Sequence, residues 1–223
     1  MKAYCSIGGW STANCKMLNH RTDIYRNVED AFAAKHGDVC LDTQKVYLDI
    51  GSGSSPIPTL LHQNYFPKTY ATELDTVYLD QQRDYMKTLG MSEGNSFIVQ
   101  REDATQLSFA NGSVDFITAV STIEHIPGDG DILAMSEFAR VLPSGGRLIV
   151  TVPTDVTYVE NQSTWYYGGF ERRYDPAALQ SRHAHPDLKL VDQLYMVSPS
   201  QEFTRLFHND FEDIFLSSNP IRT

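Results

Sequence analysis

The feature of this sequence that most constrains its fold is a regular alternation of short apolar segments with segments of helical periodicity between residues 45 and 153. The apolar segments are bounded by Gly, Asp and Ser, which is typical of buried strands. The segments between them repeat apolar residues every three or four positions, as helices packed on a sheet do. This alternation predicts parallel βαβ units in a doubly wound α/β sheet. The expected strands are residues 46–50, 69–75, 96–103, 114–122 and 147–153.

The segments on either side follow other patterns. Apolar spacing predicts a helix over residues 23–37, within a leader formed by residues 1–40. Residues 154–187 are rich in aromatic, Gly and polar residues and are expected to be an insertion that includes a short helix. Residues 188–197 and 211–218 are predicted to be two strands that pair antiparallel and close the sheet. The expected fold is a Rossmann-like, doubly wound, seven-stranded, mostly parallel sheet with an antiparallel C-terminal strand, in a single domain over the whole chain.

Length and composition exclude several classes of protein. A chain of 223 residues is long enough for one buried α/β core. Its net charge of −10 would repel a phosphate backbone, so no nucleic-acid partner is expected. No apolar run approaches the ~20 residues of a membrane span, and the first residues lack the apolar stretch of a secretion signal, so we expect a cytoplasmic protein without a membrane partner. The odd set of Cys5, Cys15 and Cys40, with no C-x-x-C pair, predicts neither a disulfide framework nor a metal site. The sequence does not predict the oligomeric state.

The loop after the first predicted strand is the first candidate for ligand binding, because ligands of open α/β sheets lie beyond the carboxyl ends of the strands. Gly51 and Gly53 would let the backbone turn sharply and approach a ligand closely, and the N-terminus of the next helix would offer N–H donors. Asp49 adds a carboxylate that would repel a pyrophosphate. Pro56 stands where the dinucleotide fingerprint G-x-G-x-x-G has its third glycine. Asp49 and Pro56 therefore argue against a nicotinamide-dependent oxidoreductase.

Acidic residues follow the next two predicted strands. Glu73 lies 22 residues after Gly51, where an acidic side chain can accept two hydrogen bonds from a ribose diol. Asp103 could accept a hydrogen bond from an exocyclic amine, while Ala104 and Leu107 offer apolar cover for a purine. Alternatively, Glu73 is an ordinary solvated charge and Asp103 caps the following turn. Taken together, these residues predict an adenosine pocket.

The segments VYLDIGSGSSPIP, ATELD, REDATQLSFANGSVDFITAVSTIEHI and EFARVLPSGGRLIVTVP resemble successive motifs of the class I S-adenosylmethionine-dependent methyltransferases, with a type 11-like domain. The resemblance implies S-adenosyl-L-methionine as cofactor and S-adenosyl-L-homocysteine as product. It also implies that the first loop holds the methionine part, that the acid of the second strand holds the ribose, and that the Asp of the third strand holds the adenine amine. Ser55 stands where the family commonly has a further glycine. By position, the expected cofactor-binding residues are Asp49, Gly51, Ser52, Gly53, Glu73, Leu74, Asp103, Ala104 and Ser121.

Two groups of residues are candidates to meet the methyl acceptor. Histidine as a residue type titrates near neutral pH, so His125, after the fourth strand, could remove a proton from an acceptor hydroxyl. Alternatively, His125 packs as a structural residue at the sheet edge. The aromatic and arginine side chains of the insertion could form an acceptor wall, or they could pack as a loop whose arginines bind the protein's own carboxylates. The expected acceptor-binding residues are Trp165, Tyr166, Arg172, Arg173 and Tyr174.

These expectations define a division of the chain and a function. The division is a leader or lid at 1–40, a cofactor-binding core at 41–153, an acceptor-side insertion at 154–187 and C-terminal strands at 188–223. The predicted function is transfer of a methyl group from S-adenosylmethionine to a small-molecule acceptor, with oxygen as the expected acceptor atom and no metal. Two alternatives remain: a noncatalytic S-adenosylmethionine-binding or scaffold protein of the same fold, and a nicotinamide-dependent oxidoreductase.

Overall fold

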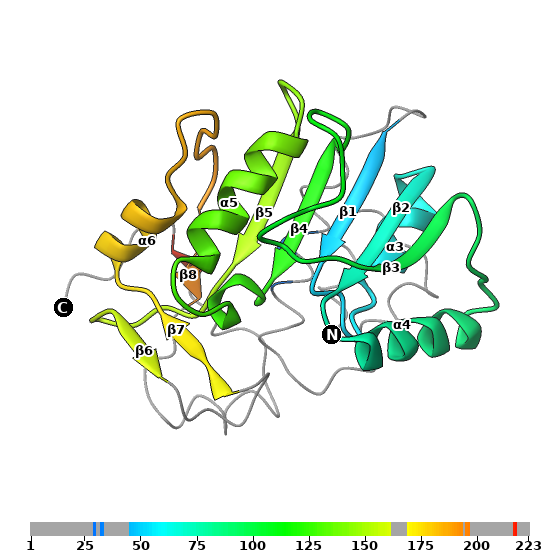
Figure 1. Ribbon diagram of the computed structural model, residues 1–223, viewed down its shortest axis with the longest axis horizontal. Helices are drawn as coiled ribbons and strands as arrows, with labels where there is room; N and C mark the ends of the chain where they lie inside the picture. Colours follow the sequence, from blue (N-terminus) through cyan, green and yellow to red (C-terminus); the bar gives the residue numbers. More distant parts are fainter. Residues whose placement is uncertain are drawn as a thin grey trace.

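The structure of the protein is a computed structural model, which describes residues 29, 32–33, 45–161, 169–193, 195–196 and 216–217 (Figure 1). None of the helices in these described ranges is long and apolar enough to cross a membrane. The described strands and helices are β1 (Val46–Ile50), α3 (Ile57–Asn64), β2 (Lys68–Glu73), α4 (Thr76–Thr88), β3 (Phe97–Arg101), β4 (Phe116–Val120), the 3₁₀ turn η2 (Ile123–His125), α5 (Gly130–Val141), β5 (Arg147–Thr151), β6 (Val159–Asn161), β7 (Glu171–Arg173), α6 (Pro176–His183), β8 (Tyr195–Met196) and β9 (Leu216–Ser217).

The centre of the molecule is a five-stranded sheet in the order β3-β2-β1-β4-β5, with every neighbouring pair parallel. The chain therefore starts in the middle of the sheet, builds one half outward to β3, and returns to build the other half from β4. This arrangement confirms the predicted doubly wound α/β fold. Strand order reverses between β1 and β4, so the connections that follow these two strands run to opposite faces of the sheet. Ligands of such sheets bind at this point.

Helices cover both faces of the sheet. α3 and α4 pack on one face, and α5 packs on the other, in front of the sheet in Figure 1. Because side chains alternate along a strand, Tyr47 and Phe116 lie under α3, where their rings are 5.6 Å apart, while Leu48 and Ile117 pack against α5. Ala33 in the leader is helical and fully buried in the α3 cluster. The rest of the predicted helix at 23–37, except residues 29 and 32, lies outside the described residues.

The five strands predicted between residues 46 and 153 are all present, but four of them end earlier than expected. In two of these strands, a residue predicted to be in the strand has another role or backbone conformation. Asp75 is the N-cap of α4 and accepts a hydrogen bond from the Val77 N–H at 2.9 Å, and Ser121 has a positive φ of 50°. Side chains at the strand tips therefore belong to loops rather than to the sheet.

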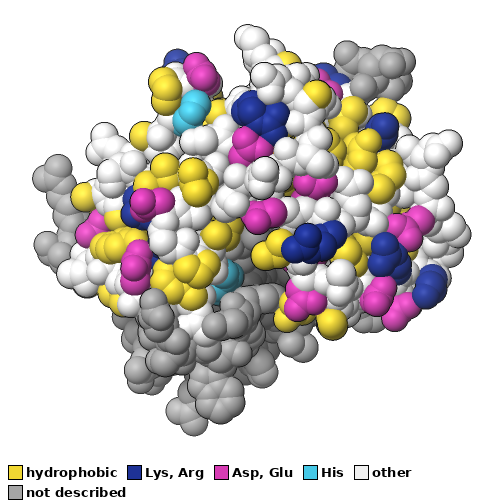
Figure 2. All heavy atoms as spheres, viewed as in Figure 1, with side chains coloured by type: hydrophobic (Ala, Val, Ile, Leu, Met, Phe, Trp, Pro, Cys, Tyr) yellow, Lys and Arg dark blue, Asp and Glu magenta, His cyan; other side chains and the backbone are white. Residues whose placement is uncertain are grey.

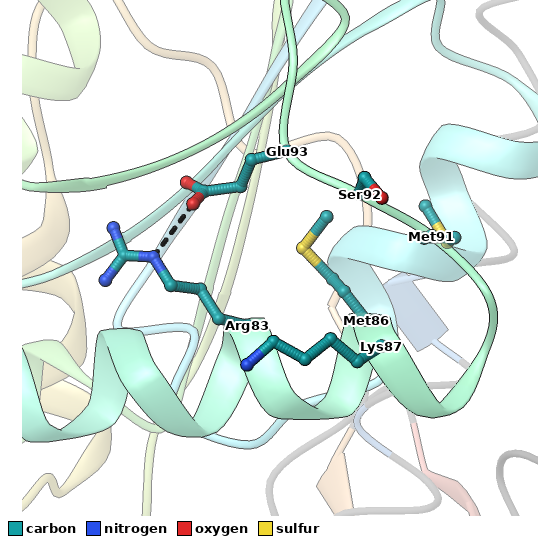
Figure 3. Close-up of a pocket in the computed structure, with 6 residues that line it drawn as sticks. All are labelled: Arg83, Met86, Lys87, Met91, Ser92 and Glu93. Carbon is teal, nitrogen blue, oxygen red and sulfur yellow. Dashed lines mark hydrogen bonds and ion pairs between the residues drawn. The ribbon is translucent and has the colours of Figure 1, made fainter.

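The outer edge of β3 is covered by side chains from outside the strand. The Val99 N–H donates to Glu93 at 3.0 Å, and Arg83 of α4 donates to the Val99 carbonyl at 3.1 Å. Figure 3 shows Arg83 and Glu93 joined by an ion pair of 2.9 Å, beside a hollow that Met86, Met91 and other residues line. This hollow contains none of the predicted site residues.

The predicted insertion contains a hairpin and a helix. β6 and β7 pair antiparallel, and α6 follows with Asp175 as its N-cap, accepting from the Ala178 N–H at 2.7 Å. The helix confirms the prediction of a short helix in this segment. In Figure 1 the hairpin lies beside the carboxyl ends of β4 and β5, next to η2.

The C-terminal strands differ in part from the prediction. β8 and β9 pair antiparallel, as expected, with Tyr195 opposite Ser217. Within the described residues, however, they form a separate two-stranded sheet, and residues 188–193 are not in a strand. The prediction that these strands close a seven-stranded sheet is therefore not met in the described part of the chain: the apolar pattern of 188–193 belongs to a largely exposed segment in which only Leu188 packs against the core.

Charged side chains are interspersed on the face shown in Figure 2. Lys and Arg lie among Asp and Glu there, and the described residues of that face form no continuous basic patch. Absence of a nucleic-acid partner stays a prediction from the net charge.

Candidate functional site

The loop between β1 and α3 is held firmly on the tip of β2. Its Gly51 and Gly53 have φ values of 70° and 47°, which favour glycine. Between them, the Ser52 N–H donates to the Thr72 carbonyl at 2.9 Å, and the Ser52 hydroxyl accepts from the Thr72 N–H at 3.0 Å. Ser52 is only 2% exposed. Its side chain therefore holds the loop in place, and its contact to a ligand stays a prediction.

The same loop contacts the loop after β4. A Cβ added at Gly51 would overlap the side chain of Thr122, whose hydroxyl donates to the Ile50 carbonyl at 3.1 Å. At Gly53 a Cβ would lie 3.7 Å from a Glu73 carboxylate oxygen, Oε1. The two glycines thus let the backbone of residues 51–53, here called the glycine cradle, fit closely between the tips of β2 and β4.

Glu73 lies at the end of β2, beside this cradle. Its Oε1 accepts from the Gly53 N–H at 2.8 Å, and its Oε2 accepts from the Leu74 N–H at 3.2 Å. Burial raises the pKa of Glu73 to about 7, an effect that these two hydrogen bonds oppose and that the nearby charges of Asp49 and Asp75 reinforce. Each carboxylate oxygen has a second lone pair, so Glu73 can still accept hydrogen bonds from a diol. Leu74, which is 52% exposed, lies next to it.

Asp103 follows β3 at the rim of the same edge. The two strand tips are joined because the Glu102 N–H donates to the Glu73 carbonyl at 3.0 Å. One oxygen of Asp103, Oδ1, accepts from both the N–H and the hydroxyl of Thr105, at 2.9 and 2.7 Å. Asp103 therefore does cap the next turn, while its other oxygen takes part in neither bond and the side chain is exposed. Ala104 is 9% exposed and packs into the core beneath α5.

The carboxylate of Asp49 does not face the glycine cradle. It is 3% exposed, and its Oδ1 accepts hydrogen bonds from the hydroxyls of Tyr47 and Thr118. The reason is the alternation of the strand: Asp49 shares the α3 face with Tyr47, and this face is buried. The sequence-based assignment of Asp49 as a direct ligand contact is corrected accordingly. Its backbone carbonyl, which accepts from Thr72, still supports the loop.

The loop after β4 places His125 beside a buried acid. Ser121, with φ 50°, donates from its hydroxyl to Glu124, which is 1% exposed. His125 Nδ1 lies 2.9 Å from the Phe170 carbonyl of the insertion, and its Nε2 lies 3.7 Å from Glu124 Oε1. A carbonyl only accepts, so the proton of the neutral imidazole is on Nδ1. The lone pair is therefore on Nε2.

Arg172 does not lie on an acceptor wall, contrary to the sequence-based assignment. Its side chain is 0% exposed and donates to the carbonyls of Ile126 and Gly128. It also pairs with Glu160 at 3.1 Å and with Asp131 at 3.7 Å. β7 packs against η2, and the Arg172 side chain is enclosed between them, so the alternative interpretation, in which the arginine binds the protein's own carboxylates, applies to Arg172.

The other predicted acceptor residues have different positions. Tyr174 is buried and donates to Asp131 at 2.9 Å, and burial followed by the charge of Asp131 raises the pKa of its hydroxyl. Its assignment as an acceptor contact is therefore corrected as well. Arg173 is exposed, and its guanidinium lies 3.2 Å from Glu171. Trp165 and Tyr166 lie outside the described residues.

Sequence reasoning missed several residues that shape this site. Thr122 sets the space at Gly51, and Asp131 is the acid on which Arg172, Tyr174 and Arg182 converge. Thr122 had a signal in the sequence, since it is the last residue of the predicted strand 114–122. Asp131 had none, because its partners lie more than 40 residues away in the sequence. No three His, Cys, Asp or Glu side chains within the described ranges are grouped to hold a metal ion.

Comparison with known proteins agrees with this geometry. A family described as "Methyltransferase domain" matches residues 48–150. A demethylmenaquinone methyltransferase from Bacteroides fragilis is 33% identical over 104 residues, which are 46% of this chain and 41% of that protein. The chain thus spans less than half the length of this relative.

Solved structures share the fold. The PH0226 protein of Pyrococcus horikoshii superposes with a TM-score of 0.56 at 15% identity, covering 82% of this chain and 88% of that one. A SAM-dependent methyltransferase from Methanosarcina mazei superposes with a TM-score of 0.53 at 17% identity, covering 65% and 80%. Residues 48–150 are therefore similar to a methyltransferase domain, in agreement with the resemblance that the sequence motifs indicate.

Proposed function

We propose that the protein transfers a methyl group from S-adenosylmethionine to an oxygen of a small-molecule acceptor. The observation that carries the proposal is the joining of three strand tips. Gly53 donates to Glu73 at 2.8 Å, and Glu102 donates to Glu73 at 3.0 Å, so the residues after β1, β2 and β3 form one continuous rim. That is the arrangement an elongated ligand with a ribose at its centre would need.

Each part of this rim suits one part of the cofactor. Gly51 and Gly53 let the backbone approach the methionine part, and Glu73 accepts hydrogen bonds from the ribose hydroxyls. Asp103 accepts from the adenine amine through the oxygen that does not cap the turn. Leu74 lies beside Glu73 with half of its surface exposed and offers an apolar contact to the ring. The bound cofactor supplies a methyl group on a sulfonium, which is a good leaving group.

His125 is the candidate base. When an acceptor hydroxyl takes the methyl group, its oxygen must lose a proton, and we assign that proton to His125 Nε2. The contact between Nδ1 and the Phe170 carbonyl leaves the lone pair on Nε2. Glu124, 3.7 Å from Nε2, then stabilises the imidazolium that forms. In-line positioning of methyl and acceptor supplies the remaining rate enhancement.

Fewer of the predicted acceptor-binding residues remain candidates, because Arg172 and Tyr174 are buried. Of the two arginines predicted to bind the acceptor, Arg173 has the exposed side chain, at 54%. Trp165 and Tyr166 remain predicted acceptor contacts. An anionic or aromatic acceptor would suit this combination.

Calorimetric titration and labelled transfer test the function. S-adenosylhomocysteine should bind, while NAD should not. Methyl label from S-adenosylmethionine should then appear in a small-molecule extract, and the labelled species identifies the acceptor. Binding without transfer would support the noncatalytic alternative, and binding of NAD alone would support the oxidoreductase. With an acceptor in hand, His125→Ala should lower turnover by roughly 10²- to 10⁴-fold with unchanged cofactor affinity.

A further inference from the structure

The strongest feature outside the proposed cofactor rim is a group of four charges, centred on the fully buried Arg172 and Asp131, that joins the hairpin to the loop of His125. Arg172 and Arg182 supply the positive charges, and Asp131 and Glu160 supply the negative ones. Although burial alone would raise the pKa of Asp131, its hydrogen bonds with Arg182 and Tyr174 and the charge of Arg172 lower it overall. The group is therefore charged and mutually compensated.

Within this group, Arg172 contacts both the loop of His125 and the residue that is hydrogen-bonded to the His125 ring. On one side, its two terminal nitrogens donate to the carbonyls of Ile126 and Gly128, which directly follow His125. On the other side, its guanidinium lies 4.6 Å from the centre of the Phe170 ring, and the carbonyl of Phe170 is the partner of His125 Nδ1.

Only arginine has the geometry for this task. Its guanidinium is a planar fork with five N–H donors, which can reach two carbonyls and a carboxylate at once. A lysine would keep the charge opposite Asp131 and Glu160 but present one ammonium group in place of the fork. Charge and geometry can therefore be separated by a single substitution.

We propose that Arg172 is a positioning residue for His125. By fixing residues 126–128 and Phe170 together, it keeps the ring proton on Nδ1, which donates it to the Phe170 carbonyl, so that Nε2 carries the lone pair. The role of Nε2 as the base rests on the proposed function. The position and tautomer of the ring do not, because they follow from contacts of the protein alone.

The test is a pair of lysine substitutions at adjacent positions of the hairpin. Arg172→Lys removes the fork, while Arg173→Lys makes the same change in an arginine that pairs with Glu171. Tyr174→Phe is a second control, because it removes a hydrogen bond to Asp131 and leaves the carbonyls of the loop bonded. In ¹⁵N-histidine spectra, subtraction of the His125→Gln spectrum assigns the two ring nitrogens of His125.

The expected result is a protonated Nδ1 in the wild type, Arg173→Lys and Tyr174→Phe, and a mixture of tautomers in Arg172→Lys. Affinity for S-adenosylhomocysteine should stay within about twofold in all four proteins, and turnover of Arg172→Lys should fall by about 10²-fold, the loss typical of a small misplacement. An unchanged His125 spectrum in Arg172→Lys would overturn the inference. Failure of all four proteins to bind S-adenosylhomocysteine would overturn the proposed function and leave the tautomer result standing.

Discussion

The two sides of the site use their charged residues in opposite ways. On the β1–β3 side, Glu73 and Asp103 accept hydrogen bonds from backbone N–H groups of the strand-tip loops and keep further lone pairs at the rim. On the β4–β7 side, Arg172 and Asp131 are fully buried and bond to each other and to their surroundings. In the proposed function the first side receives hydrogen bonds from the cofactor, whereas the contacts of the second side hold a loop in place. A charged residue in a sequence motif therefore indicates a ligand contact only if its contacts within the protein leave some of its donors or acceptors unused.

The largest effect that follows from this contrast is on stability. Arg172→Met should lower the free energy of unfolding by about 3 kcal/mol, because it removes the guanidinium donor to the Ile126 carbonyl and one of the two guanidinium groups that compensate the buried Asp131. Arg173→Met should change it by about 0.5 kcal/mol or less, since that guanidinium is exposed. Urea unfolding measures both values. Equal losses would mean that the two arginines do not differ as described.

Next in size is the effect of closing the glycine cradle. Gly51→Ala should weaken S-adenosylhomocysteine binding by about 10²-fold or more, because the added methyl overlaps Thr122. Gly90→Ala is the matched control: its φ is 69°, but a Cβ there meets nothing within 4 Å. The control should lose about 1–2 kcal/mol of stability from the left-handed backbone and keep its affinity. Equal affinity in the two variants, with circular dichroism showing both folded, would remove the cradle from the site.

A smaller loss is expected when the charge at the β2 tip is removed. Glu73→Gln keeps the shape but weakens the hydrogen bonds to the ribose, so affinity for S-adenosylhomocysteine should fall about 10- to 100-fold at pH 8. Asp75→Asn should bind normally, because Asp75 caps α4 through Val77 and lies outside the strand. If calorimetry instead finds normal binding in Glu73→Gln and loss in Asp75→Asn, the ribose contact lies two residues further on.

The smallest effect is a pH dependence of the same contact. The pKa of Glu73 is raised to about 7 in the free protein, and the ionised form is the stronger acceptor. Binding should therefore release a proton, and affinity should rise by about tenfold at most from pH 6 to pH 8 and level off above it. Titrations in buffers of different ionisation enthalpy measure the proton release. Glu73→Gln should bind with no such dependence, and a flat profile in the wild type would place the carboxylate elsewhere.

The sequence predicted the sheet and the cofactor rim for the same physical reason. Strand periodicity and the glycines that follow β1 are local signals, so the order of tips up to Asp103 could be read directly. The orientation of Asp49 could have been read from strand alternation, which places it beside Tyr47 on the buried face. Burial of Arg172 could not, because it depends on the meeting of Glu160, Asp131 and the loop carbonyls, which are distant in the sequence. The separate β8–β9 pair likewise reflects tertiary packing.

The covering of β3 has a consequence for the protein at high concentration. An edge strand with open N–H and C=O groups is a template on which another chain can add a strand. Here Glu93 and Arg83 bond to the outward-facing groups of Val99 as an ion pair between α4, which carries Arg83, and the loop before β3, which carries Glu93. Two side chains therefore protect this edge from strand addition, and a single mutation of either one would break their ion pair. Because salt screens ion pairs, the protection and with it the solubility of the folded protein should weaken at high ionic strength.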